Sequence, residues 1–288
     1  MPTGRRDTPP PSPLMTPWPT PGLCHAQTSR GWVACSFTRL DGTTGFATRG
    51  HHAKGLDAVD SLPDVLAAHD YPGRGVLWCT TGDGTSLGAY FLTGRSPASQ
   101  ARTLRRTAED TLVVAASDTR EHDHLRHYVA ARQSRQWLVF GNGEQVSTVA
   151  DRLDAGRTPL LALDGLDYEP DPPIFTPRLT VVADGDGRAW FGAARRSAGG
   201  RTTTDRLTLH VSELPPGEAV LMTTYRSSGQ HLATGAPFTE TRTTAEDADA
   251  LLDELWSALP PRLRIAAAAF TPGHLAGAGI RQAARVGD

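Results

Sequence analysis

The sequence predicts a layered α+β fold. Most apolar segments are short, rich in β-branched and aromatic residues, and joined by Gly/Asp turns such as GDGTS (82–86) and GDG (185–187), a pattern typical of antiparallel hairpins. Helical patterns occur only between groups of strands, which argues against a doubly wound parallel sheet. The sequence also lacks a GxGxxG motif and a Walker-type phosphate loop.

The elements expected in the first half follow from apolar runs bounded by turn residues. They are two short strands around an Asp-Gly turn (31–50), a short helix (62–71), strands at 75–81 and 87–94, and strands at 111–117 and 136–141.

In the second half, apolar residues at helical spacing predict a helix over 144–156, which ends at Gly156 because glycine readily takes the left-handed C-cap conformation. TTAE at 243–246 resembles a capping box and predicts the start of a helix over 243–259. The expected strands are 178–184, 188–196, 206–214, 218–227 and the buried run 264–270.

Three segments of different composition suggest the domain organisation. Residues 1–27 hold eight of the 22 prolines and almost no apolar periodicity, which predicts a disordered tail. Residues 28–61 are expected to be an N-terminal extension with a hairpin, and 62–288 the main domain.

The overall composition is that of an ordinary globular protein. The chain of 288 residues has a formal net charge of -2, which gives no indication of nucleic-acid binding. Three cysteines without paired metal spacing favour reduced thiols in a cytoplasmic protein. No apolar run approaches the roughly 20 residues that cross a bilayer. We therefore expect a protein without a membrane span, whose strand-rich fold is compatible with a homo-oligomer.

Two clusters contain candidate ligand-binding groups. In GRSPASQAR (94–102), Arg95 and Arg102 are suited to grip a phosphate or carboxylate, because guanidinium groups bind oxyanions bidentately; the alternative is two solvent-exposed arginines. In EHDHLRHYV (121–129), the three histidines lack a metal-binding arrangement, so no metal site is expected, while Tyr128 could act as a donor in a pocket.

Two further clusters lie on the loops before and after the 144–156 helix. FGNGEQV (140–146) places Asn142 at a helix N-terminus, where backbone N–H groups favour anions, although ordinary strand-to-helix turns look similar. LDYEPDPPIFTPR (166–178) carries four prolines and alternating carboxylates, and must be an extended, preset loop. Crowded carboxylates raise one another's pKa, which suits Glu169 as a general acid or base. The alternative is a solvated acidic linker.

These clusters belong to a longer series of motifs. The series is YPGRG (71–75), YFLTGRS (90–96), LRHY (125–128), GNGEQVSTVAD (141–151), DYEPDPPIFTPR (167–178) and TTY (223–225). Over roughly 62–270 the chain thereby resembles the archaeal-type, monofunctional IMP cyclohydrolase family. The resemblance implies a four-layer αββα sandwich like that of the N-terminal-nucleophile hydrolases, without their autocatalytic nucleophile.

The resemblance also implies a reaction and a site. The family closes the purine ring of 5-formamidoimidazole-4-carboxamide ribonucleotide to give IMP and water, reversibly and without metal or redox cofactor. Glu169 would be the acid/base, and Tyr128 and Asn142 would donate hydrogen bonds to the reacting carboxamide and formyl groups. Arg95 and Arg178 would bind phosphate or orient the formyl oxygen. The remaining implied substrate-binding residues are Ser96, Arg102, Asp167, Thr176 and Tyr225.

One departure from the family pattern leaves alternatives open. Bacterial members commonly carry a GRSxxSRNR-like run, where this chain has Gln100 and Ala101 in place of an arginine and an asparagine. The chain could therefore act on a related heterocyclic nucleotide in specialised metabolism, or bind a nucleotide without turnover.

Overall fold

The chain forms two units, Met1–Ala58 and Val59–Asp288. The computed structural model describes the strands β1 (Cys35–Thr38) and β2 (Thr44–Ala47), and then residues 59–108, 110–117, 125–197, 199–226 and 238–284. β1 and β2 pair antiparallel, with Cys35 opposite Ala47. The tail predicted for 1–27 and the histidines His122 and His124 lie outside the described residues.

A seven-stranded antiparallel sheet forms one layer of the second unit. Its strand order is β11-β10-β9-β8-β7-β6-β5. The strands are β5 (Arg102–Ala108), β6 (Thr111–Ala116), β7 (Tyr128–Ser134), β8 (Trp137–Gly141), β9 (Arg178–Ala183), β10 (Ala189–Arg196) and β11 (Thr204–Val211).

A six-stranded antiparallel sheet forms the adjacent layer, in the order β13-β12-β3-β4-β14-β15. Its strands are β3 (Arg74–Thr80), β4 (Ser86–Thr93), β12 (Glu218–Thr223), β13 (Thr239–Arg242), β14 (Arg264–Phe270) and β15 (Gly279–Gln282). Every strand pair in both sheets is antiparallel, so the α+β prediction is confirmed.

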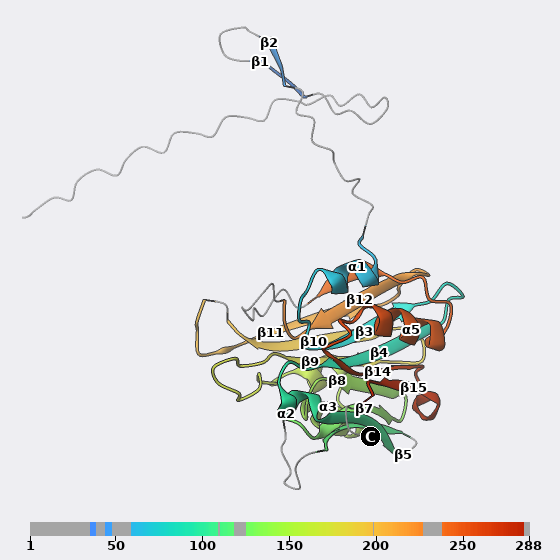
Figure 1. Ribbon diagram of the computed structural model, residues 1–288. Coiled ribbons are helices and arrows are strands. Elements are labelled where there is room, and N and C mark those ends of the chain that lie inside the picture. The colour runs from blue at the N-terminus through green and yellow to red at the C-terminus, as the bar shows by residue number, and fades with distance from the viewer. Residues whose placement is uncertain are drawn as a thin grey trace, which may run out of the picture. The chain divides into compact units, whose positions relative to one another are not determined.

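The apolar clusters define how the layers pack. Side chains from both sheets, among them Trp78 of β3 and Phe140 of β8, form one core between them. The outer face of the six-stranded sheet packs against α1 (Leu62–Ala67) and α5 (Ala248–Ala258), and that of the seven-stranded sheet against α3 (Gln145–Asp154) and α4 (Pro159–Leu163) (Figure 1). Side chains alternate along a strand, and the apolar residues of β3 enter both cores: Trp78 faces one core and Leu77 the other.

The helix boundaries test two of the capping predictions. Gly156 has φ +84° just after α3 and donates its N–H to Leu153 O, so the glycine C-cap is confirmed. The capping box at 243–246 is wrong: α5 begins at Ala248, and Asp247 is its N-cap, accepting from Ala250 N at 2.8 Å. Thr243 instead donates its hydroxyl to Glu254.

Several elements escaped sequence analysis because they are short or polar on their exposed face. These are β5, β7, β13, β15, α4, the single turn α2 (Pro97–Gln100) and the 3₁₀ turn η1 (Leu275–Gly277). In addition, the first helix ends at Ala67, earlier than expected, and β12 ends at Thr223, so the chain turns away from the sheet before Tyr225. No helix in the described part of the chain is long and apolar enough to cross a membrane.

Candidate functional site

A cavity of about 340 Å³ collects residues from most of the segments that the sequence analysis singled out. Its lining comes from the start of β3, the turn around α2, the 169–176 loop and the segment after β12. The lining residues are Tyr71, Gly73, Arg74, Thr93, Ser96, Ala98, Ser99, Arg102, Leu125, Arg126, Glu169, Asp171, Thr176 and Tyr225.

A buried ion pair forms the floor of this cavity. Arg74 donates from Nη1 to Glu169 Oε1 at 2.8 Å and from Nη2 to Oε2 at 2.9 Å. Nη1 also donates to the carbonyl of Asn142 at 2.7 Å. Both partners are almost fully buried, Arg74 at 6% and Glu169 at 3% exposure. Such a bidentate geometry fixes the orientation of the carboxylate.

Burial changes the acidity of this pair. It raises the pKa of the Glu169 carboxyl above its ordinary value of 4.5, and the guanidinium of Arg74 opposes that rise without cancelling it. Burial by itself would lower the pKa of Arg74, but the carboxylate of Glu169, together with Tyr128 and Tyr225, raises that pKa well above its ordinary value. Arg74 therefore stays a cation, while Glu169 can exchange a proton at a pH closer to neutrality.

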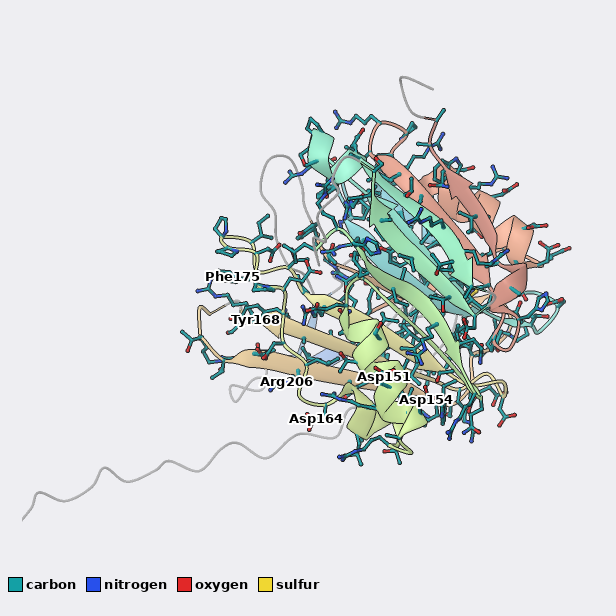
Figure 2. All side chains as sticks on the ribbon, turned by 90° about the horizontal axis from the view of Figure 1, so that it is seen from below. Asp151, Asp154, Asp164, Tyr168, Phe175 and Arg206 are labelled. Carbon is teal, nitrogen blue, oxygen red and sulfur yellow. The ribbon has the colours of Figure 1, made fainter. Side chains whose placement is uncertain are left out.

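The loop that carries Glu169 is held at both ends, as expected for a preset segment. Glu169 N donates to Thr176 O at 2.9 Å, which closes the loop on itself. The ring of Tyr168 packs edge-on against Phe175, with centroids 5.6 Å apart (Figure 2). Asn142 Nδ2 donates to Pro177 O at 2.8 Å, which ties the end of the loop to the end of β8. The segment is therefore a rigid wall of the cavity, and the interpretation as a loop is confirmed.

Stacked tyrosines and a threonine line the next wall. The rings of Tyr71 and Tyr225 stack with centroids 5.5 Å apart. The hydroxyl of Tyr225 lies 2.7 Å from Thr176 Oγ1. Gly73 lies beneath the stack with φ +74°, and a Cβ there would come within 2.2 Å of Thr224 Oγ1 and 2.5 Å of the Tyr225 ring. Only glycine allows this approach, which explains Gly73, the first glycine of YPGRG.

The end of the cavity formed by the α2 turn is basic. Arg102 lines it and is largely buried, donating to Ser99 O at 2.7 Å and to Thr93 O at 3.2 Å. Arg126 is a further arginine of the lining. Ser96 and Ser99 cap the single turn α2 reciprocally. This end combines guanidinium groups with hydroxyls, as an oxyanion requires.

The predicted site residue Arg95 and the departing residue Gln100 lie beside the cavity. Arg95 is exposed and places its guanidinium 4.6 Å from the centre of the Tyr71 ring. Gln100 is not among the lining residues, and its amide donates to Gly94 O and Arg262 O, each at 3.0 Å. The side chain of Gln100 thus connects the α2 turn to the segment that precedes β14.

Besides Arg95, four predicted site residues do not line the cavity. Asn142 accepts from Leu179 N and Gln145 through its side-chain oxygen, so its amide is used in fixing the loop. Tyr128 lies in the core between the sheets, with its hydroxyl 2.7 Å from that of Tyr90. Asn142 contacts the ion pair through its backbone carbonyl, which accepts from Arg74.

The other two are Asp167 and Arg178. Asp167 faces β11, where its carboxylate accepts from Thr204 at 2.6 Å and from Arg206 at 2.9 Å. Arg178 is the first residue of β9 and pairs with Glu144 at 2.6 Å. Its guanidinium also lowers the pKa of the Glu169 carboxyl. Both residues thus hold the loop and its surroundings.

The lining residues that sequence analysis did not propose for the site include Arg74, Tyr71, Asp171 and Arg126. Arg74 and Tyr71 belong to YPGRG, and a basic residue at the entrance of an otherwise apolar strand is a signal that could have found Arg74. Arg126 belongs to LRHY. Asp171 was noted for its charge alone.

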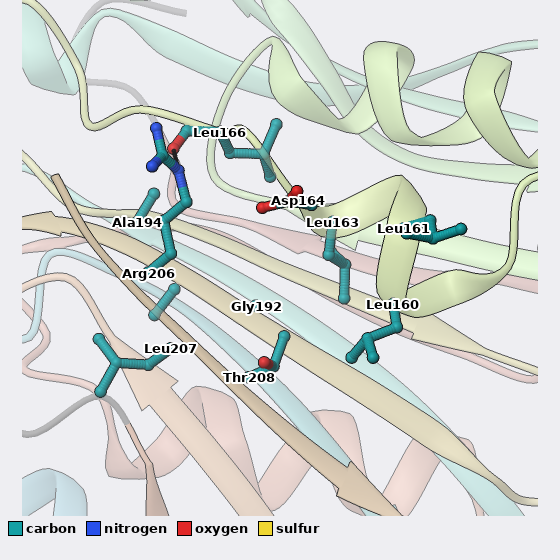
Figure 3. A pocket seen from close by; sticks show the side chains of 11 residues that line it. Leu160, Leu161, Leu163, Asp164, Leu166, Gly192, Ala194, Arg206, Leu207 and Thr208 are labelled. Carbon is teal, nitrogen blue, oxygen red and sulfur yellow. Dashed lines mark hydrogen bonds between the residues drawn. The ribbon is translucent and has the colours of Figure 1, made fainter.

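A second cavity, of about 320 Å³, lies on the outer face of the seven-stranded sheet. Figure 3 shows Leu163 of α4 turned toward Gly192, and Arg206 donating to the carbonyl of Leu166 at 2.6 Å. It is mainly apolar and contains no buried ion pair. Among the described residues, no group of three histidine, cysteine or carboxylate side chains is arranged to hold a metal ion.

Comparisons with known proteins match the part of the chain that contains the cavity. A family model described as IMP cyclohydrolase-like protein matches residues 71–272, which include the whole cavity lining. The IMP cyclohydrolase of Methanopyrus kandleri is 29% identical over 159 residues, 54% of this chain and 75% of that protein. That of Methanothrix thermoacetophila is 28% identical over 163 residues, 55% and 76%. That of Halobacterium salinarum is 30% identical over 119 residues, 40% and 60%.

Proposed function

The chain belongs to the IMP cyclohydrolase-like family, and we propose on that premise that it closes the purine ring of 5-formamidoimidazole-4-carboxamide ribonucleotide to give IMP and water. The carboxamide nitrogen attacks the formyl carbon, and a C–N bond forms. The formyl oxygen then leaves as water, taking one proton from the carboxamide nitrogen and one from the formamide nitrogen. The same steps run in reverse for ring opening.

One observation carries this proposal. A buried carboxylate of raised pKa, Glu169, is oriented by Arg74 in a cavity that Arg102 and Arg126 also line. The reaction requires a proton shuttle at the reacting centre and an anchor for a phosphate several ångströms away. The cavity supplies both within about 340 Å³, a volume suited to a small ligand.

Glu169 is the proposed proton shuttle. It accepts the proton that the carboxamide nitrogen loses and returns a proton to the departing oxygen. The bidentate contact with Arg74 holds the carboxylate still, so that little reorganisation accompanies the transfer. Asn142 is a positioning residue, because its carbonyl accepts from Arg74 and its amide ties down Pro177. Tyr128 supports the same region from the core between the sheets.

The basic end is the proposed phosphate site. Arg102 and Arg126 line it, Ser96 adds a hydroxyl, and Arg95 reaches the rim over the ring of Tyr71. Charge-assisted hydrogen bonds from such groups anchor a phosphate strongly. Thr176 and Tyr225 line the wall next to the reacting groups. Arg178 and Asp167 support the loop in this proposal and do not contact the nucleotide.

The proposal also covers the fold family, the domain boundaries, the cofactor requirement, the cellular location and self-association. The order of layers, with helices outside two facing sheets, supports an αββα sandwich related to the N-terminal-nucleophile hydrolases. The cyclohydrolase domain is proposed to span 62–288, following an N-terminal extension. Ring closure of this kind proceeds by proton transfer, so the proposed mechanism uses no cofactor. A cytoplasmic location and self-association are likewise proposed.

Incubation of the full chain with the formamido nucleotide tests this function, because ring closure changes the ultraviolet absorbance. We expect IMP to form at a rate that Glu169→Gln lowers and that the matched surface substitution Glu213→Gln leaves unchanged. A folded protein that forms no IMP would contradict the proposal. It would favour the alternatives of a related nucleotide substrate or of binding without turnover.

The structure also bears on the altered-substrate alternative. This alternative is based on Gln100, which replaces an arginine common in bacterial members. Gln100 does not line the cavity and makes two backbone contacts outside it, whereas Arg102 and Ser99 remain in the lining. The replacement therefore leaves the basic end of the cavity in place, which favours the IMP reaction.

A further inference from the structure

A hydrogen-bonded series of three side chains runs along the cavity wall beside the ion pair. Thr176 donates its hydroxyl to Asp171 Oδ2 at 2.5 Å, and the backbone N–H of Thr176 donates to Asp171 Oδ1 at 2.7 Å. The hydroxyl of Tyr225 lies 2.7 Å from Thr176 Oγ1. All three residues line the cavity.

The number of hydroxyl protons fixes the direction of the hydrogen bonds among Asp171, Thr176 and Tyr225. A hydroxyl has one proton to donate, and that of Thr176 goes to the carboxylate of Asp171. In the contact between the two hydroxyls, Tyr225 must therefore be the donor. The only proton of Tyr225 is then used within the wall, and its oxygen offers a lone pair alone to a ligand.

The geometry keeps Tyr225 in this state. Its ring is stacked on Tyr71 and fits closely over Gly73, so the phenol cannot swing away from Thr176. Burial raises the pKa of Tyr225, and the phenol therefore stays neutral in the physiological range.

We propose that Tyr225 is a specificity-determining residue whose oxygen accepts an N–H from the ligand, so that the site takes a heterocyclic nucleotide with a carboxamide and rejects the matching carboxylate. The proposal rests on the proposed function, which places a nucleotide carboxamide in this cavity. A carboxamide nitrogen can donate to Tyr225 and is thereby turned toward its reaction partner. A carboxylate oxygen would meet a second lone pair, and the contact would be left unsatisfied.

The size of the discrimination follows from that mismatch. An unsatisfied buried polar contact lowers affinity by on the order of ten- to a hundredfold. Two nucleotides that cannot cyclise serve as probes: 5-aminoimidazole-4-carboxamide ribonucleotide and 5-aminoimidazole-4-carboxylate ribonucleotide. Calorimetry with the full chain should give at least about tenfold tighter binding of the carboxamide.

Asp171→Asn should reverse this preference. The backbone N–H of Thr176 is a fixed donor, so the amide oxygen of the new side chain turns to it and the amide NH₂ faces Thr176 Oγ1. The Thr176 proton then points to Tyr225, whose own proton is released toward the ligand. The variant is expected to bind the carboxylate nucleotide more tightly than the carboxamide.

Thr176→Val separates this effect from simple charge. It keeps the negative charge of Asp171 and the approximate volume of the side chain, but it frees the proton of Tyr225 to turn to either ligand. The preference for the carboxamide should fall to less than about threefold. Asp186→Asn, the same substitution as at Asp171 but at an exposed turn, is the matched control and should keep the wild-type preference.

Equal binding of the two probes by the wild-type protein would overturn the inference. An unchanged preference in Thr176→Val would also overturn it, because charge would then explain the selectivity, and this result decides the matter even if Asp171→Asn fails to fold. Neither outcome affects the proposed cyclisation. A folded wild-type protein that binds neither nucleotide would overturn the proposed function itself, and the inference with it.

Discussion

Replacing Arg74 with methionine should destabilise the protein strongly, because it leaves a buried carboxylate without its cation. Arg74 and Glu169 are only 6% and 3% exposed, so solvent cannot take over the lost contacts. The substitution removes donors at 2.8 and 2.9 Å from the carboxylate and at 2.7 Å from the carbonyl of Asn142. Breaking a buried pair from one side typically costs about 3–5 kcal/mol of unfolding free energy.

The pH dependence of this loss identifies its cause. Arg74→Met removes the main influence that opposes the burial-driven rise in the pKa of Glu169, and Arg178 opposes that rise to a smaller extent. The folded state therefore holds a proton at a pH where the unfolded chain, with a pKa of 4.5, has lost it. A raised folded pKa gives stability that is present at low pH and is lost as the pH rises. The deficit relative to wild type should therefore be small near pH 4 and largest at neutral pH.

Urea denaturation followed by circular dichroism, at several pH values, measures the loss of unfolding free energy and its dependence on pH. The double variant Arg74→Met/Glu169→Leu should recover most of the loss, because apolar residues replace both charges. Arg201→Met breaks an exposed pair with Asp205 and should cost less than about 1 kcal/mol. A loss below about 1 kcal/mol in Arg74→Met, or a loss independent of pH, would refute this account of the ion pair.

Three further predictions follow from the site. Glu169→Gln should lower ring closure on the order of a hundredfold while leaving IMP affinity largely intact, as separate turnover and binding measurements would show; unchanged turnover would remove Glu169 from the mechanism. Arg95→Ala should weaken nucleotide binding by about tenfold in calorimetry, and an unaltered affinity would place the phosphate elsewhere. Gly73→Ala should cost on the order of 2 kcal/mol or more in denaturation, because it combines φ +74° with a 2.2 Å approach to Thr224. Gly84→Ala, with φ +87° and no atom within 4 Å, should cost less.

Gln100 departs from the family pattern, and its contacts in the structure change the interpretation of that departure. From the sequence, the loss of an arginine at position 100 suggests weaker phosphate binding. In the structure the side chain at this position faces the chain before β14, with both hydrogen bonds going to backbone carbonyls. The departure therefore concerns how the α2 turn is held, and the phosphate end is built from Arg102 and Arg126.

Local chemistry along the chain was sufficient to predict the α+β class and the preset loop around Glu169. Prolines exclude the interior of a helix and a central strand, and short apolar runs between Gly/Asp turns form hairpins from local preferences. The glycine after α3 could be predicted for the same reason. The Thr/Glu pattern before α5 failed, because Asp247 competes for the same cap and wins it.

The partners of each site residue were decided only by the tertiary structure. Arg74 and Glu169 lie 95 positions apart, and Thr176 and Tyr225 lie 49 apart; no periodicity links them. Strand order brings them together, since β3 is central in one sheet and the loop before β9 belongs to the other. The same packing turns Asp167 toward β11 and uses the amide of Asn142 within the loop. Sequence specifies which groups are available, and the packing of two sheets determines which of them share a cavity.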